Sequence, residues 1–182
     1  MNLGILVLRV LLGSILVAHS FQKSRGWFGG LGPDRMATVF EGLGLRPGRA
    51  MVLTASTFEL LAALSLLAGV LTPLGAVTAV GTMGVAGLTM SHASGRLWNA
   101  AGGGEYPFVL AATAAVLGFT GAGAYSVDAV LRHAMPGAAT LLEPHALTGV
   151  LVVVVGCLAT VPFARVLWGG RATIDPEADE AV

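Results

Sequence analysis

The sequence predicts an all-α membrane protein, with a bundle of four transmembrane helices followed by a fifth, C-terminal transmembrane helix. Its 182 residues are 55% hydrophobic and only 11% charged, with a mean hydropathy of +0.81. Soluble domains carry about a quarter charged residues. The 26 glycines suit helices that pack closely within a membrane. Apolar runs of the length needed to cross a bilayer recur along the chain, which completes the case for several spans.

The first apolar run, residues 3–21, predicts a spanning helix. At 1.5 Å per residue its length approaches the roughly 30 Å thickness of a bilayer's hydrocarbon core. Arg9 interrupts the run and His19 lies near its end. An ionisable side chain inside a membrane costs about 2.5 kcal/mol or more, so it often marks a functional site. A cleaved signal peptide is the alternative, but no positive charge precedes the run and Arg9 breaks it.

The loop that follows, residues 22–49, is polar and glycine-rich and carries five of the ten basic residues. Within it, residues 33–43 predict an amphipathic helix that starts at Pro33 and stops at Gly42. The apolar side chains share one face, which predicts a helix on the membrane surface: Met36, Val39, Phe40 and Leu43.

Two further spans are expected at residues 50–71 and 74–91, separated by a tight turn at Thr72-Pro73. In the second, a glycine at every third position from Gly81 to Gly87 predicts a contact stripe for a neighbouring helix. Residues 106–120 are short for a span, so residues 121–125 are expected to extend that helix.

The remainder of the chain predicts an amphipathic turn of helix at residues 126–133 and a spanning helix at 144–168. Three regions result. Residues 1–128 form the four-helix core, residues 129–170 the connection and the extra helix, and residues 171–182 an acidic, disordered tail.

Most basic side chains lie in segments that five spans place on the side of the first loop. The positive-inside rule therefore predicts a multi-pass protein of the bacterial inner membrane, with a cytoplasmic first loop and the N-terminus outside.

The composition also excludes classes of function. A net charge of zero without a basic run gives no support for nucleic-acid binding. The single cysteine, Cys157, excludes an internal disulfide or a CxxC redox pair. The four histidines show no metal-binding spacing, so we expect no metal site and no covalently bound cofactor.

The polar residues within the spans predict a binding site. Helical rise places Arg9 and Glu59 at similar depths, about 6 Å apart along the membrane normal, which predicts an ion pair between them. Other polar and aromatic residues are expected near the cytoplasmic boundary, where they would form a funnel above that pair: His19, Lys23, Trp98, Asn99, Glu105 and Tyr106. Such a funnel suits a quinone or a similar amphiphile, with His19 and Glu105 as candidate proton carriers. The alternatives are that Arg9 snorkels outward while Glu59 is protonated, and that the aromatic residues form an interfacial belt.

Several segments in order resemble the DoxX family of small bacterial membrane proteins. They are LVLRVLLG around Arg9, AHSFQKSRGWFGG from residue 18, FELLAALSLLAGVLTPLGA from residue 58, WNAAGGGEYP from residue 98, and the AYSVD that ends at residue 128. Ser20 departs from the glycine that commonly follows the histidine, and the helix at 144–168 lies beyond the family's four-helix core. The resemblance covers residues 3–128 and implies that core.

The resemblance also implies a link to quinone or thiol redox chemistry. The family is named for its similarity to membrane subunits of a thiosulfate:quinone oxidoreductase. An actinobacterial relative is associated with an oxidative-stress complex that contains superoxide dismutase and a sulfurtransferase. For this chain, both a redox-linked subunit that binds a quinone and a non-catalytic membrane anchor for soluble redox enzymes fit. A small-solute carrier has less support, because no inverted repeat is visible. An oligomer is compatible with the sequence.

Overall fold

The computed structural model describes residues 2–134 and 145–169, and this part of the chain is entirely helical. Four helices are long and apolar enough to span a membrane, and a fifth apolar helix is shorter. The elements, in order, are α1 (Asn2–Ser24), α2 (Gly32–Gly42), α3 (Gly48–Ala68), α4 (Thr72–Ser94), the 3-10 turn η1 (Asn99–Ala101), α5 (Glu105–Thr120), α6 (Val127–Ala134) and α8 (Ala146–Gly169). The predicted fold class, an all-α membrane bundle, is confirmed.

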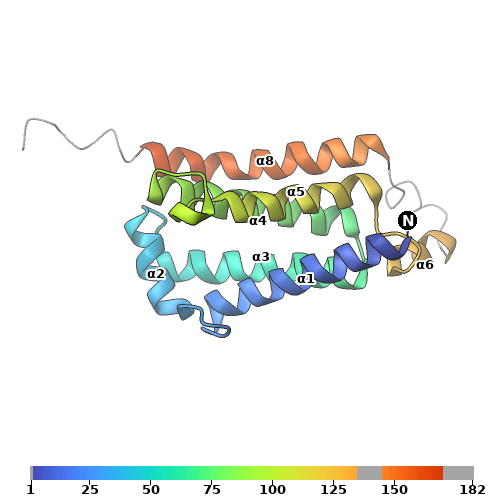
Figure 1. Cartoon of the computed structure of the whole chain (residues 1–182), viewed down its shortest axis with the longest axis horizontal. Coiled ribbons are helices and arrows are strands. Elements are labelled where there is room, and N and C mark those ends of the chain that lie inside the picture. The colour runs from blue at the N-terminus through green and yellow to red at the C-terminus, as the bar shows by residue number, and fades with distance from the viewer. Residues whose placement is uncertain (1, 135–144, 170–182) are drawn as a thin grey trace, which may run out of the picture.

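The long helices run side by side along one axis (Figure 1). α1 packs on α3, α3 packs on α4, and α4 contacts both α5 and α8. α2 crosses the bundle at one end and α6 lies at the other (Figure 1). We call these the α2 end and the α6 end. The α2 end therefore gathers the C-termini of α1, α4 and α8 with the N-termini of α3 and α5.

The core consists of side chains that face the centre of the bundle, while many large apolar side chains point outward. The buried cluster includes Leu16 of α1, Leu66 of α3, Met83 of α4 and Leu117 of α5. α8 exposes Leu147 and Leu158 among others. Apolar outer faces on long helices are the surface that a bilayer covers. The chain is a multi-pass membrane protein.

The glycines of α4 allow neighbouring helices to approach closely, as expected for the contact stripe predicted from Gly81 to Gly87. A Cβ at Gly84 would lie 2.8 Å from Cγ2 of Thr160 on α8. A Cβ at Gly87 would lie 2.6 Å from the ring of Phe108 on α5. The stripe thus contacts two helices rather than one.

One predicted boundary is wrong. Residues 121–125 do not extend α5, because Gly121 adopts φ 68° and ends the helix after Thr120. With 16 residues α5 is about 24 Å long, shorter than the hydrocarbon core. Residues 121–125 instead fold over the α6 end, where they form hydrogen bonds with Arg9 and Asn2 of α1. The predicted tail at 171–182 lies outside the described residues.

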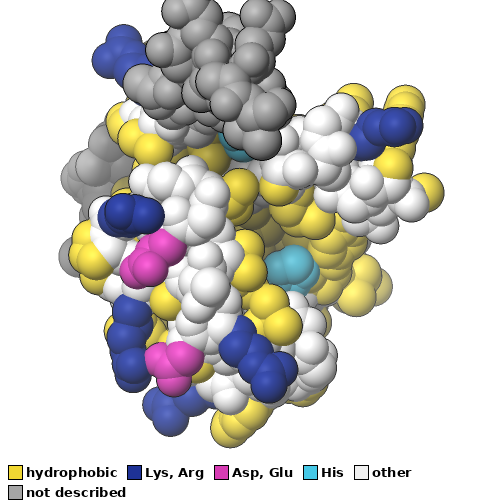
Figure 2. Space-filling model, turned by 90° about the vertical axis from the view of Figure 1, so that its left-hand side faces the viewer, with side chains coloured by type: hydrophobic (Ala, Val, Ile, Leu, Met, Phe, Trp, Pro, Cys, Tyr) yellow, Lys and Arg dark blue, Asp and Glu magenta, His cyan; other side chains and the backbone are white. Residues whose placement is uncertain are grey.

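Basic side chains ring the α2 end, which Figure 2 views from outside the bundle. They come from the end of α1, from α2, from the start of α3, from the loops and from the last turns of α8: Lys23, Arg25, Arg35, Arg46, Arg49, Arg96 and Arg165. The charge asymmetry expected from the sequence is therefore a real asymmetry between the two ends.

Candidate functional site

A cavity of about 520 Å³ opens at the α2 end between α1, α3, α4 and α8. Its wall is almost entirely apolar and includes Phe58, Val77, Val85 and Phe163. Ligand sites typically measure 300–1,000 Å³ and combine apolar walls with a few placed polar groups. In Figure 2 apolar side chains are visible in the hollow between the basic ones.

α2 covers part of this cavity. Met36, Val39, Phe40 and Leu43 all line it. The shared face predicted from their spacing is confirmed, and it turns toward the cavity. The place of this helix on the membrane surface stays a prediction. The helix is held against α3 by Glu41, whose carboxylate accepts the N–H of Gly48 at 3.0 Å.

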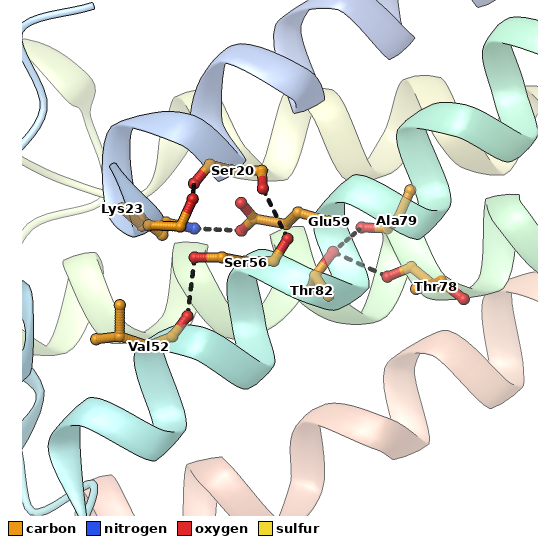
Figure 3. A network of polar contacts seen from close by, with 9 residues as sticks. Ser20, Lys23, Val52, Ser56, Glu59, Thr78, Ala79 and Thr82 are labelled. Carbon is orange, nitrogen blue, oxygen red and sulfur yellow. Dashed lines mark hydrogen bonds and ion pairs between the residues drawn. The ribbon is translucent and has the colours of Figure 1, made fainter. Parts of the chain in front are cut away.

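Lys23 of α1 and Glu59 of α3 form an ion pair at the cavity wall (Figure 3). The Glu59 side chain is only 1% exposed, whereas that of Lys23 is 15% exposed. Oε1 of Glu59 accepts a hydrogen bond from the Lys23 ammonium. Oε2 of Glu59 is buried without a partner among the described residues. Nearby, the Ser20 hydroxyl donates to the carbonyl of Ser56 at 2.8 Å and ties the two helices together. A buried carboxylate oxygen with no partner is an acceptor available to a ligand.

The predicted Arg9–Glu59 ion pair is therefore wrong. Arg9 is 1% exposed and donates to four backbone carbonyls near the α6 end. Nε donates to Leu66 at 2.7 Å, and Nη2 to Leu67 at 3.0 Å, in the last turn of α3. Nη1 donates to Ala122 at 2.7 Å and Tyr125 at 2.9 Å. Arg9 lies about 15 Å along α1 from His19 and takes no part in the cavity.

The charge that attracts Arg9 is Asp128 at the start of α6. This carboxylate is fully buried and accepts the backbone N–H groups of Leu71 at 2.7 Å and Thr72 at 2.9 Å. Asp128 thus binds the N-terminus of α4, where a negative charge is favoured. Arg9 and Asp128 together clamp the α3–α4 turn against the segment after α5. Sequence reasoning missed this role, although Asp128 stands in the quoted AYSVD segment.

His19 is the other ionisable residue that the cavity gains from α1. Its ring stacks on Tyr106 of α5, with the ring centroids 5.7 Å apart and an angle of 29° between the planes. Tyr106 does not itself line the cavity but orients the imidazole at its edge. The structure brings His19, Lys23 and Glu59 together at the cavity wall, with Tyr106 stacked on His19.

The other predicted funnel residues lie in the loop before α5. Trp98 is 65% exposed, and the Asn99 N–H donates to Oε2 of Glu105 at 3.0 Å. This bond closes the glycine-rich loop around η1. None of the three lines the cavity, so the predicted funnel with Trp98, Asn99 and Glu105 at its mouth is wrong in that part.

Threonines of α4 were missed by the sequence reasoning. Thr78, Thr82 and Thr89 line the cavity opposite Glu59. The Thr82 hydroxyl donates to the Thr78 carbonyl at 2.9 Å (Figure 3), whereas Oγ1 of Thr89 has no partner in the described part of the chain. Their spacing, a polar stripe along an apolar helix, was the available signal. Thr89 adds a second unpaired polar atom to the cavity wall.

No group of three or more histidine, cysteine or acidic side chains that could hold a metal occurs within residues 2–134 and 145–169. Cys157 of α8 is exposed and does not line the cavity.

Comparison with known proteins identifies the part of the chain that carries this site. The DoxX family model matches residues 4–92. These residues form a DoxX domain. The domain covers α1 to nearly the end of α4 and contains His19, Lys23, Glu59 and the cavity-lining threonines. The resemblance of residues 98–128 lies beyond the match and stays a prediction. No curated protein and no solved structure matches the chain significantly.

Proposed function

We propose that this DoxX-domain protein is a redox-linked membrane subunit that binds a quinone or a similar flat-headed amphiphile in the cavity at the α2 end. One observation carries the proposal: Glu59, whose buried Oε2 has no partner among the described residues, lines a mostly apolar cavity together with Lys23 and His19. The apolar wall suits a hydrocarbon tail, and the three ionisable groups suit a polar head.

The polar groups match both redox states of such a ligand. A quinone head offers only carbonyl acceptors. The Lys23 ammonium and the N–H group of the His19 ring can donate hydrogen bonds to them. A quinol head offers hydroxyl donors, which Oε2 of Glu59 can accept. His19 lies at the edge of the cavity against Tyr106, where it can pass protons between the head group and the α2 end. By the positive-inside rule, this end faces the cytoplasm.

Electrons would come from a partner, a membrane-associated redox protein. The only cysteine in the chain lies away from the cavity, so its thiol cannot reduce a ligand bound there. The protein's own residues would bind the head group, exclude water from it and carry its protons.

The test is native mass spectrometry of the protein extracted with its lipids. We expect the wild type to retain a quinone and the variants Glu59→Gln and His19→Ala to lose it. Glu105→Gln and His133→Ala serve as matched controls, because their side chains do not line the cavity. Loss of the quinone in the controls as well, or a wild type that never retains one, would refute the proposal.

A membrane anchor for soluble redox enzymes is the second candidate, and the exposed basic side chains of the α2 end favour it. Soluble enzymes that co-purify with the wild type and with Glu59→Gln alike, without a small molecule, would establish this function instead.

A further inference from the structure

A second pocket, of about 320 Å³, lies on the outer surface of the α1–α3 pair. It is formed by Phe21 of α1, by Arg25 directly after that helix, and by residues of α3 that include Arg49, Leu53, Thr57 and Leu60. The cavity of the proposed quinone site contacts Ala55, Phe58 and Glu59, on the opposite face of α3. The two pockets therefore have different walls and different surroundings.

This outer pocket has two arginines at one end and two leucines along its length, with small hydroxyl side chains between them. Arg25 and Arg49 lie at the α2 end, and Thr57 lies about 12 Å along α3 from Arg49. Leu53 and Leu60 follow along α3, four and eleven residues after Arg49, so they lie below it on one face of the helix. The distance along the helix from Arg49 to Leu60 is about 16 Å. A ligand that fits this pattern has an anionic head and a hydrocarbon chain that runs toward the bilayer centre.

The charges of the two arginines are available to such a head. Arg25 is exposed and forms no ion pair within the described ranges. Nη1 of Arg49 contacts Oδ1 of Asp34 at 2.6 Å, but both side chains are largely exposed, and exposed pairs are weak. The planar guanidinium presents five N–H donors in a fork that matches phosphate oxygens, so Arg49 can bind a phosphate while it keeps Asp34.

We propose that the pocket between α1 and α3 is a binding site for an anionic phospholipid, with its phosphate held by Arg25 and Arg49. The acyl chain lies against Leu53 and Leu60. Basic pockets between transmembrane helices are a known way to hold acidic lipid head groups. A lipid in this place also covers the junction at which Ser20 and Ser56 join the two helices.

The experiment compares lipid retention by native mass spectrometry after reconstitution in vesicles that contain equal parts of phosphatidylcholine and phosphatidylglycerol. The wild type is expected to retain phosphatidylglycerol. The double variant Arg25→Gln/Arg49→Gln should lose retention by roughly tenfold or more, because each arginine attracts an anionic head. The single variant Arg25→Gln, which leaves the Asp34–Arg49 pair intact, should show a smaller loss in the same direction.

The matched control is Arg35→Gln/Arg46→Gln. It removes the same charge from the same end of the molecule, but neither arginine lines the pocket. Equal losses in both double variants would overturn the proposal, since that would indicate a general surface attraction. Release of the lipid by added inorganic phosphate would overturn it as well, because the site would then bind a free anion. Quinone retention is measured in the same spectra, so failure of the lipid site and of the quinone site are distinguishable.

Discussion

The ion pair between Lys23 and Glu59 should be measurable as an energetic coupling between α1 and α3. In Lys23→Met, Glu59 keeps a carboxylate that is 1% exposed and loses its cation. Breaking a buried pair from one side costs about 3–5 kcal/mol, and the partial exposure of Lys23 favours the lower figure. In Glu59→Gln, the Lys23 ammonium can turn toward water, so we expect a cost of about 1 kcal/mol.

The double variant Lys23→Met/Glu59→Gln removes both charges, and a buried pair replaced by neutral groups often costs little. We expect it to lose about 2 kcal/mol, against about 4 kcal/mol for the two single changes added together. The coupling energy is then about 2 kcal/mol. The assay is the free energy of unfolding of the four proteins in mixed detergent micelles, titrated with denaturing detergent.

A second cycle, with Arg9→Gln and Glu59→Gln, serves as the control. Arg9 binds backbone carbonyls far from Glu59, so these two changes should be additive within about 0.5 kcal/mol. The reasoning fails if the Lys23 cycle is additive, or if the Arg9 cycle carries the larger coupling.

Three further changes test the clamp at the α6 end and the cavity wall. Asp128→Asn should lower the free energy of unfolding by about 1–2 kcal/mol, because an amide replaces one acceptor for Leu71 and Thr72; an unchanged thermal midpoint would contradict this. Gly69→Ala should cost more than about 2 kcal/mol, since φ is 63° and the new methyl group would collide with the guanidinium of Arg9. Gly29→Ala, with φ 76° but open space around it, should cost only about 1 kcal/mol, and equal losses would refute the collision. Thr89→Val should leave unfolding within about 1 kcal/mol of the wild type, because its buried hydroxyl has no described partner. It should nevertheless weaken quinone retention in native mass spectrometry. Full retention would show that the Thr89 hydroxyl does not take part in quinone binding.

The helices could be predicted from sequence because their signals are local. The first helix was expected at residues 3–21 and is observed at Asn2–Ser24. A turn was expected at Thr72-Pro73, whereas the chain turns at residues 69–71 and Thr72 already begins α4. α5 was less predictable, because its apolar run continues across Gly121. The backbone conformation of that single glycine ends the helix.

The partner of Arg9 could not be predicted for a physical reason. The helical rise gives the depth of each side chain along the membrane normal, and Glu59 was the acidic side chain at a depth similar to that of Arg9. The acceptors that Arg9 uses are backbone carbonyls, including those left free by the end of α3 and by the segment after α5. Every residue carries a carbonyl, so no sequence pattern distinguishes these four. Lys23 and Glu59 were both predicted for the site, but their pairing depends on how α1 is rotated against α3.

The contacts of Arg9 set an order on the assembly of the protein in the membrane. During synthesis, α1 enters the bilayer with a guanidinium whose acceptors do not yet exist. Two of the four arrive with the last turn of α3, and the other two only with Ala122 and Tyr125. Until then the charge is held by water, by lipid head groups or by the insertion machinery. α1 therefore reaches its final depth only after α5, the fourth apolar stretch of the chain, has begun to pack. The helix that is synthesised first is one of the last to take its final position.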